Sequence, residues 1–183
     1  MNRGYHEIKE HGKREFPFNI YPCSIPVDFS HVALHWHEEM EIIAVKKGKG
    51  RITVDTVSYP VEEGDILAVF PGQLHAISCG NGERMEYENI IFRLSMLMGD
   101  NGDGCTVHFL KPLQEGQAKN PVLIQRNQPD HEVFGKVIQE LDRFSEIRGN
   151  GYQLAVKGQL FLFLYYAYGR GILFTEKKPG HAR

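Results

Sequence analysis

The chain has 183 residues, of which 42% are hydrophobic and 24% are charged, and its formal net charge is −2. This length is enough for one domain with a real core, or for one domain with a small appendage. The charge balance argues against nucleic-acid binding through bulk positive charge, because such domains usually have a basic face and a high isoelectric point.

The cysteines and the apolar runs indicate the setting of the protein. Cys23, Cys79 and Cys105 are odd in number and form no C-x-x-C spacing, so we expect a reducing, cytoplasmic environment. The start of the chain is polar and lacks the apolar core of a signal peptide. The longest apolar run, LFLFLYYAY at 160–168, is about half of the ~20 residues that a membrane-spanning helix needs. We therefore expect no membrane partner.

The first part of the chain predicts an arm followed by a series of strands. Residues 1–16 are polar and are expected to form a flexible arm. The next stretch, FPFNIYPCSIPVDF, holds three prolines and is typical of extended chain or an edge strand. We expect further strands near 32–36, 40–46, 50–54, 57–61, 65–69, 75–79, 86–93 and 106–110. Their regular spacing favours a sandwich or barrel, which we place within residues 17–128.

The hydrophobic period changes after Pro129, and residues 129–171 are expected to form a pair of helices. The first should cover about 131–147, and the second should run from about Tyr152 to Tyr168. The second half of this second helix is apolar on nearly every side, which is more than the first helix and the barrel could cover. We therefore expect a homodimer interface on it, formed by Leu160, Phe161, Phe163 and Leu164. The polar residues 172–183 are expected to be a linker.

One strand-like stretch, ALHWHEEMEIIAV at 33–45, carries polar residues at even spacing. His35, His37 and Glu41 are separated by two and four positions. On an extended chain such residues point to the same side, because side chains alternate between the two faces. Two imidazoles and a carboxylate on one face form either a solvated surface or a site.

A second block, GDILAVFPGQLHAI, begins 23 residues after Glu41. Together the two blocks resemble the two cupin motifs, which implies a jelly-roll-like antiparallel β-barrel, here followed by the C-terminal pair of α-helices. In cupins that hold a metal, the positions matching His35, His37, Glu41 and His75 are its ligands. Three imidazoles and one carboxylate suit one divalent ion of Zn, Fe, Mn, Ni or Cu, with coordination positions left open.

The remaining motif positions are structural, with three departures from the cupin pattern. We expect Gly48, Gly50, Gly64 and the Pro71–Gly72 pair to form tight turns between strands, where glycine allows a positive φ. Phe29, Phe70 and Cys79 stand where cupins usually have glycine, proline and asparagine. These departures leave the ligand set intact but favour a branch other than the cupin enzymes.

That branch is the AraC/XylS family of bacterial transcription regulators. Its N-terminal effector domains carry H-x-H-x-x-x-E-I-x-x-V-x-x-G-x-G, which resembles His35 to Gly50, and G-D-x-x-x-x-x-P-G-x-x-H, which resembles Gly64 to His75. An amphipathic helix and a GY element follow in the family, as at 131–147 and 151–152. The resemblance spans about 32–170 and implies an effector-sensing, dimerising domain. It implies DNA binding only through a C-terminal helix-turn-helix region, to which nothing in residues 1–183 corresponds.

Two alternatives stay open at this point. The cluster of His35, His37, Glu41 and His75 could be a polar lumen without metal, in which His37 and Glu41 hydrogen-bond a hydroxylated or anionic small-molecule effector directly. The chain could also be a stand-alone metal-dependent cupin enzyme, a dioxygenase or isomerase. The sequence shows no further general base placed by a motif, and barrel enzymes do not need the helical pair, so we expect no enzymatic activity.

Overall fold

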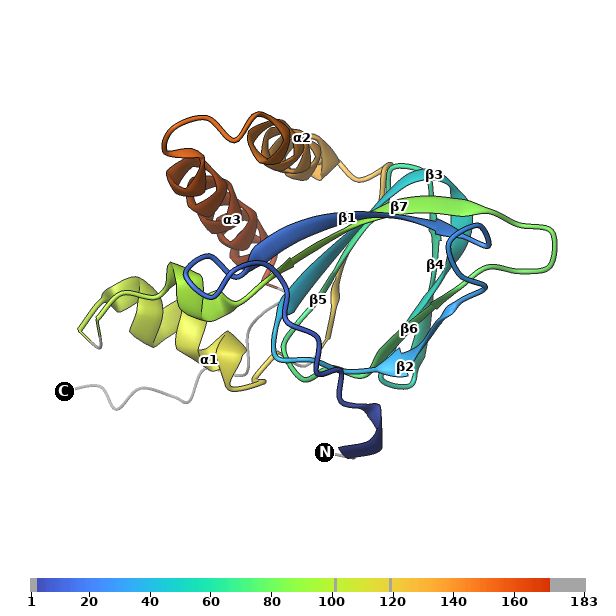
Figure 1. Cartoon of the computed structure of the whole chain (residues 1–183), viewed down its shortest axis with the longest axis horizontal. Coiled ribbons are helices and arrows are strands. Elements are labelled where there is room, and N and C mark those ends of the chain that lie inside the picture. Colours follow the sequence, from blue (N-terminus) through green and yellow to red (C-terminus); the bar gives the residue numbers. More distant parts are fainter. Residues whose placement is uncertain (1–2, 101, 119, 172–183) are drawn as a thin grey trace.

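The computed structural model describes residues 3–100, 102–118 and 120–171. Within these residues, eight antiparallel strands wrap into a barrel, and two long helices lie across one of its outer faces (Figure 1). The strands are β1 (Phe18–Ile25), β2 (Val32–His35), β3 (Met40–Val54), β4 (Val57–Glu62), β5 (Ile66–Val69), β6 (His75–Ser78), β7 (Met85–Phe92) and β8 (Val122–Ile124). The helices are α1 (Lys111–Gln114), α2 (His131–Ile147) and α3 (Tyr152–Gly169). The mainly β architecture with a C-terminal helical pair is the expected one.

Strand β3 belongs to both sides of the barrel. Its first half pairs with β5 and β7, in the sheet ordered β1-β7-β3-β5-β8, and its second half pairs with β4 and β6. The register with β7 shifts between Val45 and Lys47, and the pairing with β4 and β6 begins shortly after, at Lys49 and Arg51. The expected strands at 40–46 and 50–54 are therefore one continuous strand.

The first half of β3 is buried on both faces. Ile43 and Val45 point into the barrel with other aliphatic side chains, while Ile42 and Ala44 pack toward the helices. Period-two alternation places Glu41 on the same face as Ile43, which is the inner one. This explains why the stretch is an almost unbroken apolar run that nevertheless contains a carboxylate.

The expected strand at 106–110 is wrong. Thr106–Leu110 forms a π-helical turn that continues directly into α1. The Asp103 carboxylate accepts hydrogen bonds from the Thr106 backbone N–H at 2.8 Å and from its hydroxyl at 2.7 Å, which fixes the start of the helical turn. Leu110 and Leu113 are then buried on one side while Val107 and Phe109 stay largely exposed. The β-branched and aromatic composition of this segment favoured a strand, and the local cap outweighs that preference.

Gly64 and Gly72 lie in turns with φ of 94° and 80°, as expected. Gly48 and Gly50 lie inside β3 and not in a turn between strands, although Gly48 has a positive φ of 78°. At Gly48 a side chain would also collide with the Arg84 carbonyl oxygen, 2.1 Å from the Cβ position. Gly50 differs, because its φ is not positive; there a Cβ would lie 2.8 Å from the Met85 sulfur, so close packing is the reason for glycine.

The polar residues 1–16 were expected to form a flexible arm, but the described part lies against the barrel. Two backbone hydrogen bonds of 2.9 Å join it to Trp36, one from Trp36 N–H to Tyr5 and one from Glu7 N–H to the Trp36 carbonyl. His11 is 5% exposed and Phe16 is buried in the core. The expected linker at 172–183 lies outside the described residues.

The two long helices have the expected bounds, but α3 is covered more completely than its composition suggested. Leu160 and Phe163 are fully buried, and Leu164 nearly so, against β-sheet and α2 side chains of the same chain. Of the four residues expected at a dimer interface, Phe161 alone is exposed, so the other three are not available to a partner as predicted. Among the described residues, no helix combines the length and the hydropathy that crossing a membrane requires.

Candidate metal and effector site

Four side chains from different segments meet at one end of the barrel; we call them the His/Glu cluster. His35 ends β2, His37 lies in the following loop, Glu41 is near the start of β3, and His75 opens β6. His35 and His75 are direct neighbours because β2 pairs with β6 at these positions. One ligand atom from each of the four residues can be chosen so that all lie within 4.8 Å of one another. The structure therefore brings together all four residues that the sequence singled out.

Backbone carbonyls orient the three imidazole rings. Each Nδ1 lies 2.9 to 3.1 Å from a carbonyl oxygen, of Ala33 for His35, Glu39 for His37 and Gln73 for His75. Because a carbonyl only accepts hydrogen bonds, this contact places the proton on Nδ1. In the neutral ring the Nε2 lone pair is then free, as in most histidines that bind metal.

The Glu41 carboxylate stands between two of these rings. Its Oε2 lies 2.9 Å from Nε2 of His37 and 3.1 Å from Nε2 of His75, and all three residues are almost completely buried. Burial opposes ionisation of Glu41, but the two imidazoles outweigh it and hold the pKa of the carboxyl well below its usual range. Burial likewise opposes a charge on His75, yet the Glu41 carboxylate outweighs it and raises the pKa of that ring.

The cluster thus favours positive charge at its centre, and this charge can be a proton or a metal ion. Three Nε2 atoms and a buried carboxylate are a donor set that divalent transition metals accept. His35 is the ring best kept neutral, since burial and the neighbouring His75 lower its pKa. The residues present therefore fit a divalent ion held by His35, His37, Glu41 and His75.

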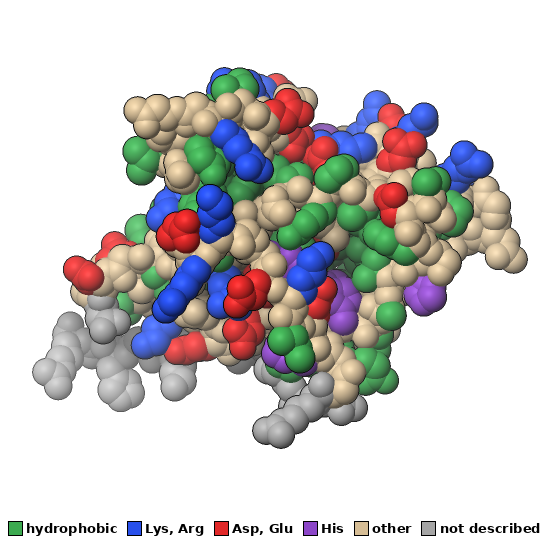
Figure 2. All heavy atoms as spheres, viewed as in Figure 1, with side chains coloured by type: hydrophobic (Ala, Val, Ile, Leu, Met, Phe, Trp, Pro, Cys, Tyr) green, Lys and Arg blue, Asp and Glu red, His purple; other side chains and the backbone are tan. Residues whose placement is uncertain are grey.

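The N-terminal segment covers this end of the barrel, which the sequence did not predict. His6 stacks on Trp36 with ring centroids 4.2 Å apart, and Glu7 Oε2 lies 3.6 Å from Nε2 of His35. His11 hydrogen-bonds the Tyr21 hydroxyl through Nδ1 at 3.2 Å. Figure 2 shows histidine atoms exposed at this end of the barrel, beside the N-terminal segment. No local pattern in the polar arm predicts these contacts, because they depend on how the N-terminal segment folds back onto the barrel.

A second missed residue is Glu39, which is 3% exposed. Its Oε1 accepts a hydrogen bond from Arg93 Nε at 2.8 Å, and its backbone carbonyl orients His37. The alternation that links His35, His37 and Glu41 also includes position 39, so the spacing could have revealed it. Glu39 and Arg93 hold the loop that presents His37.

Comparison with known proteins places the chain in a family. Residues 26–164 match the model of the AraC-like ligand binding domain. YdeC of Bacillus subtilis (strain 168), an uncharacterized HTH-type transcriptional regulator, is 27% identical over 88 residues. That match covers 48% of this chain and 30% of YdeC, so the chain spans less than a third of that relative's length.

Solved cupin structures are similar to part of the chain. A cupin 2 conserved barrel domain protein from Salinispora arenicola is 23% identical, covering 44% of this chain and 66% of its own, with a TM-score of 0.39. A cupin from Bacteroides fragilis is 25% identical, with coverages of 47% and 70% and a TM-score of 0.35. An oxalate decarboxylase with Mn(II) centres from Bacillus subtilis is 25% identical, with coverages of 34% and 18% and a TM-score of 0.31.

The family match extends over strands β2 to β8, all of α2 and most of α3, and it includes every residue of the His/Glu cluster. It agrees with the two motifs from which the sequence indicated the same regulators. The chain belongs to the family of AraC-like ligand-binding domains.

Proposed function

We propose that the chain is the effector-sensing part of an AraC-type transcription regulator, and that its small-molecule effector binds at the His/Glu cluster together with one divalent transition metal. The observation that carries this proposal is the convergence of four ligand atoms within 4.8 Å, on rings already oriented by backbone carbonyls. Family membership supports a ligand-binding role.

The residues in and around such a site would have different roles. His35, His37, His75 and Glu41 would hold the ion, which would supply an electrophilic centre for an oxygen atom of the effector. Glu39 and Arg93 keep His37 in place, and the N-terminal segment limits access of water from outside. Anionic or hydroxylated small molecules are the effector class that this arrangement suits.

The DNA-binding output and the assembly are also proposals. DNA would be bound by a helix-turn-helix region outside residues 1–183, as the name of the relative YdeC suggests. A homodimer would form on the outer stripe of α3, where Phe161, Leu162 and Tyr165 are 39%, 42% and 70% exposed. Burying such side chains against a second copy is favourable at roughly 1.5–3 kcal/mol each.

Metal content after incubation with excess Zn²⁺ and desalting tests the site. His37→Ala and Glu41→Ala should each lose the ion that the unmodified chain retains. His108→Ala and Glu38→Ala are matched controls, because both side chains are exposed and outside the cluster, and they should retain it. Equal zinc content in all five chains would show that the cluster is no metal site.

A metal-dependent enzyme is the second candidate, and the same donor set favours it. Incubating the Mn²⁺-loaded chain with oxalate, the substrate in the name of one similar cupin, separates the two. If the chain is a sensor, the oxalate concentration should stay constant during an incubation that is long enough for many catalytic turnovers. Catalytic consumption that disappears in Glu41→Ala would instead establish the enzyme.

A further inference from the structure

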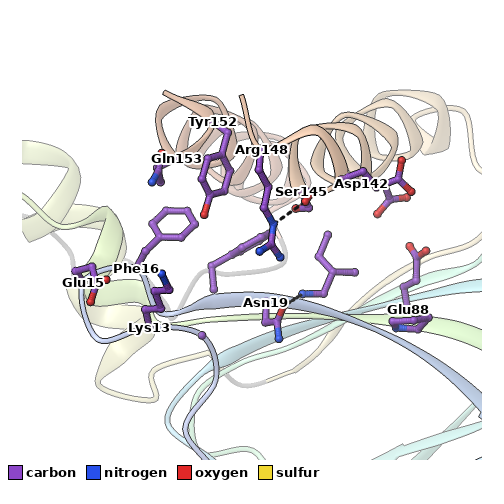
Figure 3. A pocket seen from close by; sticks show the side chains of 15 residues that line it. Lys13, Glu15, Phe16, Asn19, Glu88, Asp142, Ser145, Arg148, Tyr152 and Gln153 are labelled. Carbon is purple, nitrogen blue, oxygen red and sulfur yellow. Dashed lines mark hydrogen bonds between the residues drawn. The ribbon is translucent and has the colours of Figure 1, made fainter. Parts of the chain in front are cut away.

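A groove of about 560 Å³ lies outside the barrel, between the helical pair and the sheet (Figure 3). Most of its wall comes from the N-terminal segment with Lys13 and Phe16, strand β1 with Asn19, and the turn from α2 to α3 with Arg148 and Tyr152. It shares no residue with the His/Glu cluster. The volume falls within the ~300–1,000 Å³ typical of small-molecule sites.

Cationic donors reach into this groove from both sides. Figure 3 shows Arg148 and Tyr152 extending from the helical turn toward β1, and Lys13 rising from the opposite wall. Arg148 uses its Nε to donate to the Ser145 carbonyl at 2.9 Å, while its two terminal amino groups have no partner in the described parts of the chain. The Lys13 ammonium has none there either.

The acidic residues of the groove form no ion pair with these two side chains. Glu88 and Asp142, at one end, are both bound to Lys46, at 2.6 and 2.8 Å. Glu15 and Glu146 line the groove as exposed side chains and form no ion pair with Arg148 or Lys13. The terminal amino groups of Arg148 and the ammonium of Lys13 are therefore available as donors to an external anion.

The backbone of Arg148 gives an independent indication. This residue ends α2 in the left-handed region with φ of 46°, a position that usually belongs to glycine or asparagine. The next residue, Gly149, is a glycine, and a glycine at position 148 itself would have adopted this conformation without strain. A large side chain kept at a backbone position costing roughly 1–2 kcal/mol points to a role for the side chain itself.

Part of the groove wall is apolar and aromatic, beside the polar side chains of Asn19, Ser145 and Gln153. Phe16 and Tyr152 meet edge to face with ring centroids 5.7 Å apart, and Phe18 and Ile20 continue this surface along β1. A planar guanidinium pairs with a carboxylate through two parallel hydrogen bonds. We propose that this groove is a second ligand site, which binds a small organic monocarboxylate with its carboxylate between Arg148 and Lys13 and its apolar body against Phe16 and Tyr152.

Titration calorimetry of the chain with 3-phenylpropionate tests this site, with uncharged 3-phenyl-1-propanol as the matched ligand. We expect one saturable site for the carboxylate and at least tenfold weaker binding of the alcohol. Arg148→Gln and Lys13→Gln should each weaken carboxylate binding at least tenfold. Arg143→Gln is the control, because Arg143 lies on the same helix but pairs with Glu140 outside the groove, and it should bind normally.

Further measurements separate this site from the His/Glu cluster. His37→Ala, which removes the proposed metal site, should leave 3-phenylpropionate binding unchanged. Binding lost in His37→Ala but kept in Arg148→Gln would place the probe in the barrel and overturn the inference. Equal affinity for the carboxylate and the alcohol, or complete competition by millimolar inorganic phosphate, would equally overturn the assignment of ligand class.

Discussion

The space inside the barrel and the space between barrel and helices are filled by different side chains. Inside, the buried cluster is mainly aliphatic, with residues such as Ile43, Val45 and Ile77. Outside, it contains phenylalanines from the sheet and from both helices, among them Phe92, Phe134 and Phe163. A narrow lumen accepts branched aliphatic side chains, whereas a helix lying on a sheet leaves a wider gap that rings can fill. The outer core therefore joins the helices to the sheet through apolar burial, while the polar His/Glu cluster lies at the end of the lumen.

Removing a ring from the outer core should have the largest effect. Phe163→Ala should reduce the free energy of unfolding by about 3–5 kcal/mol, because the side chain is fully buried and packs 5.3 Å from the Phe134 ring. Denaturant titration measures this, with the 70% exposed Tyr165→Ala as control, expected within about 0.5 kcal/mol. Zinc content of the folded variant should stay normal. A parallel loss of zinc would show that the two regions are not separate.

Metal binding at the His/Glu cluster should have the second-largest effect on the free energy of unfolding. At a free Zn²⁺ concentration of 100 times the dissociation constant, we expect about 2.7 kcal/mol of added stability. Glu41→Gln should abolish this increment, because it removes the carboxylate charge, while Glu38→Gln should keep it. A stabilisation that persists in Glu41→Gln would place the ion elsewhere.

The unfolding free energy of the metal-free chain should depend on pH to a smaller extent. Two buried groups, His75 and Glu41, should change it in opposite directions as the pH rises. The pKa of His75 is raised above its ordinary 6.5, so its contribution is fully present below pH 6.5 and is lost as pH rises through the folded value. The pKa of Glu41 is lowered from 4.5, so its contribution is present above pH 4.5 and is lost on acidification.

His75 and Glu41 together should therefore stabilise the metal-free chain most between about pH 4.5 and 6.5, while the lowered pKa of His35 acts in the opposite direction below pH 6.5. Each group changes stability by at most about 1.4 kcal/mol per pH unit, the limit for one proton. Unfolding curves across this range check the prediction. Zinc-loaded chain should show the reverse trend and gain stability above pH 6.5, because the ligand histidines must be neutral.

Changes on the exposed stripe of α3 should have the smallest effect on folding and act on assembly instead. Phe161→Glu and Tyr165→Glu should convert the proposed dimer to a monomer in light scattering at micromolar concentration. Each should change the unfolding free energy of the monomer by about 0.5 kcal/mol or less. Leu154→Glu, at a 77% exposed position near the start of the helix, is the control and should leave the dimer intact. A dimer that survives both changes would exclude this stripe.

Much of the site could be predicted because it depends on local periodicity. The even spacing of His35, His37 and Glu41 fixed their common face, and the second motif added His75. The arm residues Glu7 and His11 could not be found, because their contacts with His35 and His37 join segments that no pattern relates.

The fold shows the same division. Alternating segments and helical periods gave strands and helices close to their true bounds. The helical turn at 106–110 was missed because one capping carboxylate, Asp103, decides it against the composition. The burial of Leu160 and Phe163 was also missed, since the area that a sheet and a neighbouring helix cover depends on how they pack.

Strand β3 carries Glu41 near its start and Lys46 five positions later, at an axial distance of about 17 Å. Lys46 holds Asp142 of α2 at 2.8 Å, so one unbroken segment joins the His/Glu cluster to the helical pair. Between these points β3 is hydrogen-bonded to β5 on one side and β7 on the other. A strand that is hydrogen-bonded on both edges in a close-packed interior is stiff and cannot move without its neighbours. The His/Glu cluster and the Lys46–Asp142 ion pair are therefore joined through continuous backbone, without any loop in between.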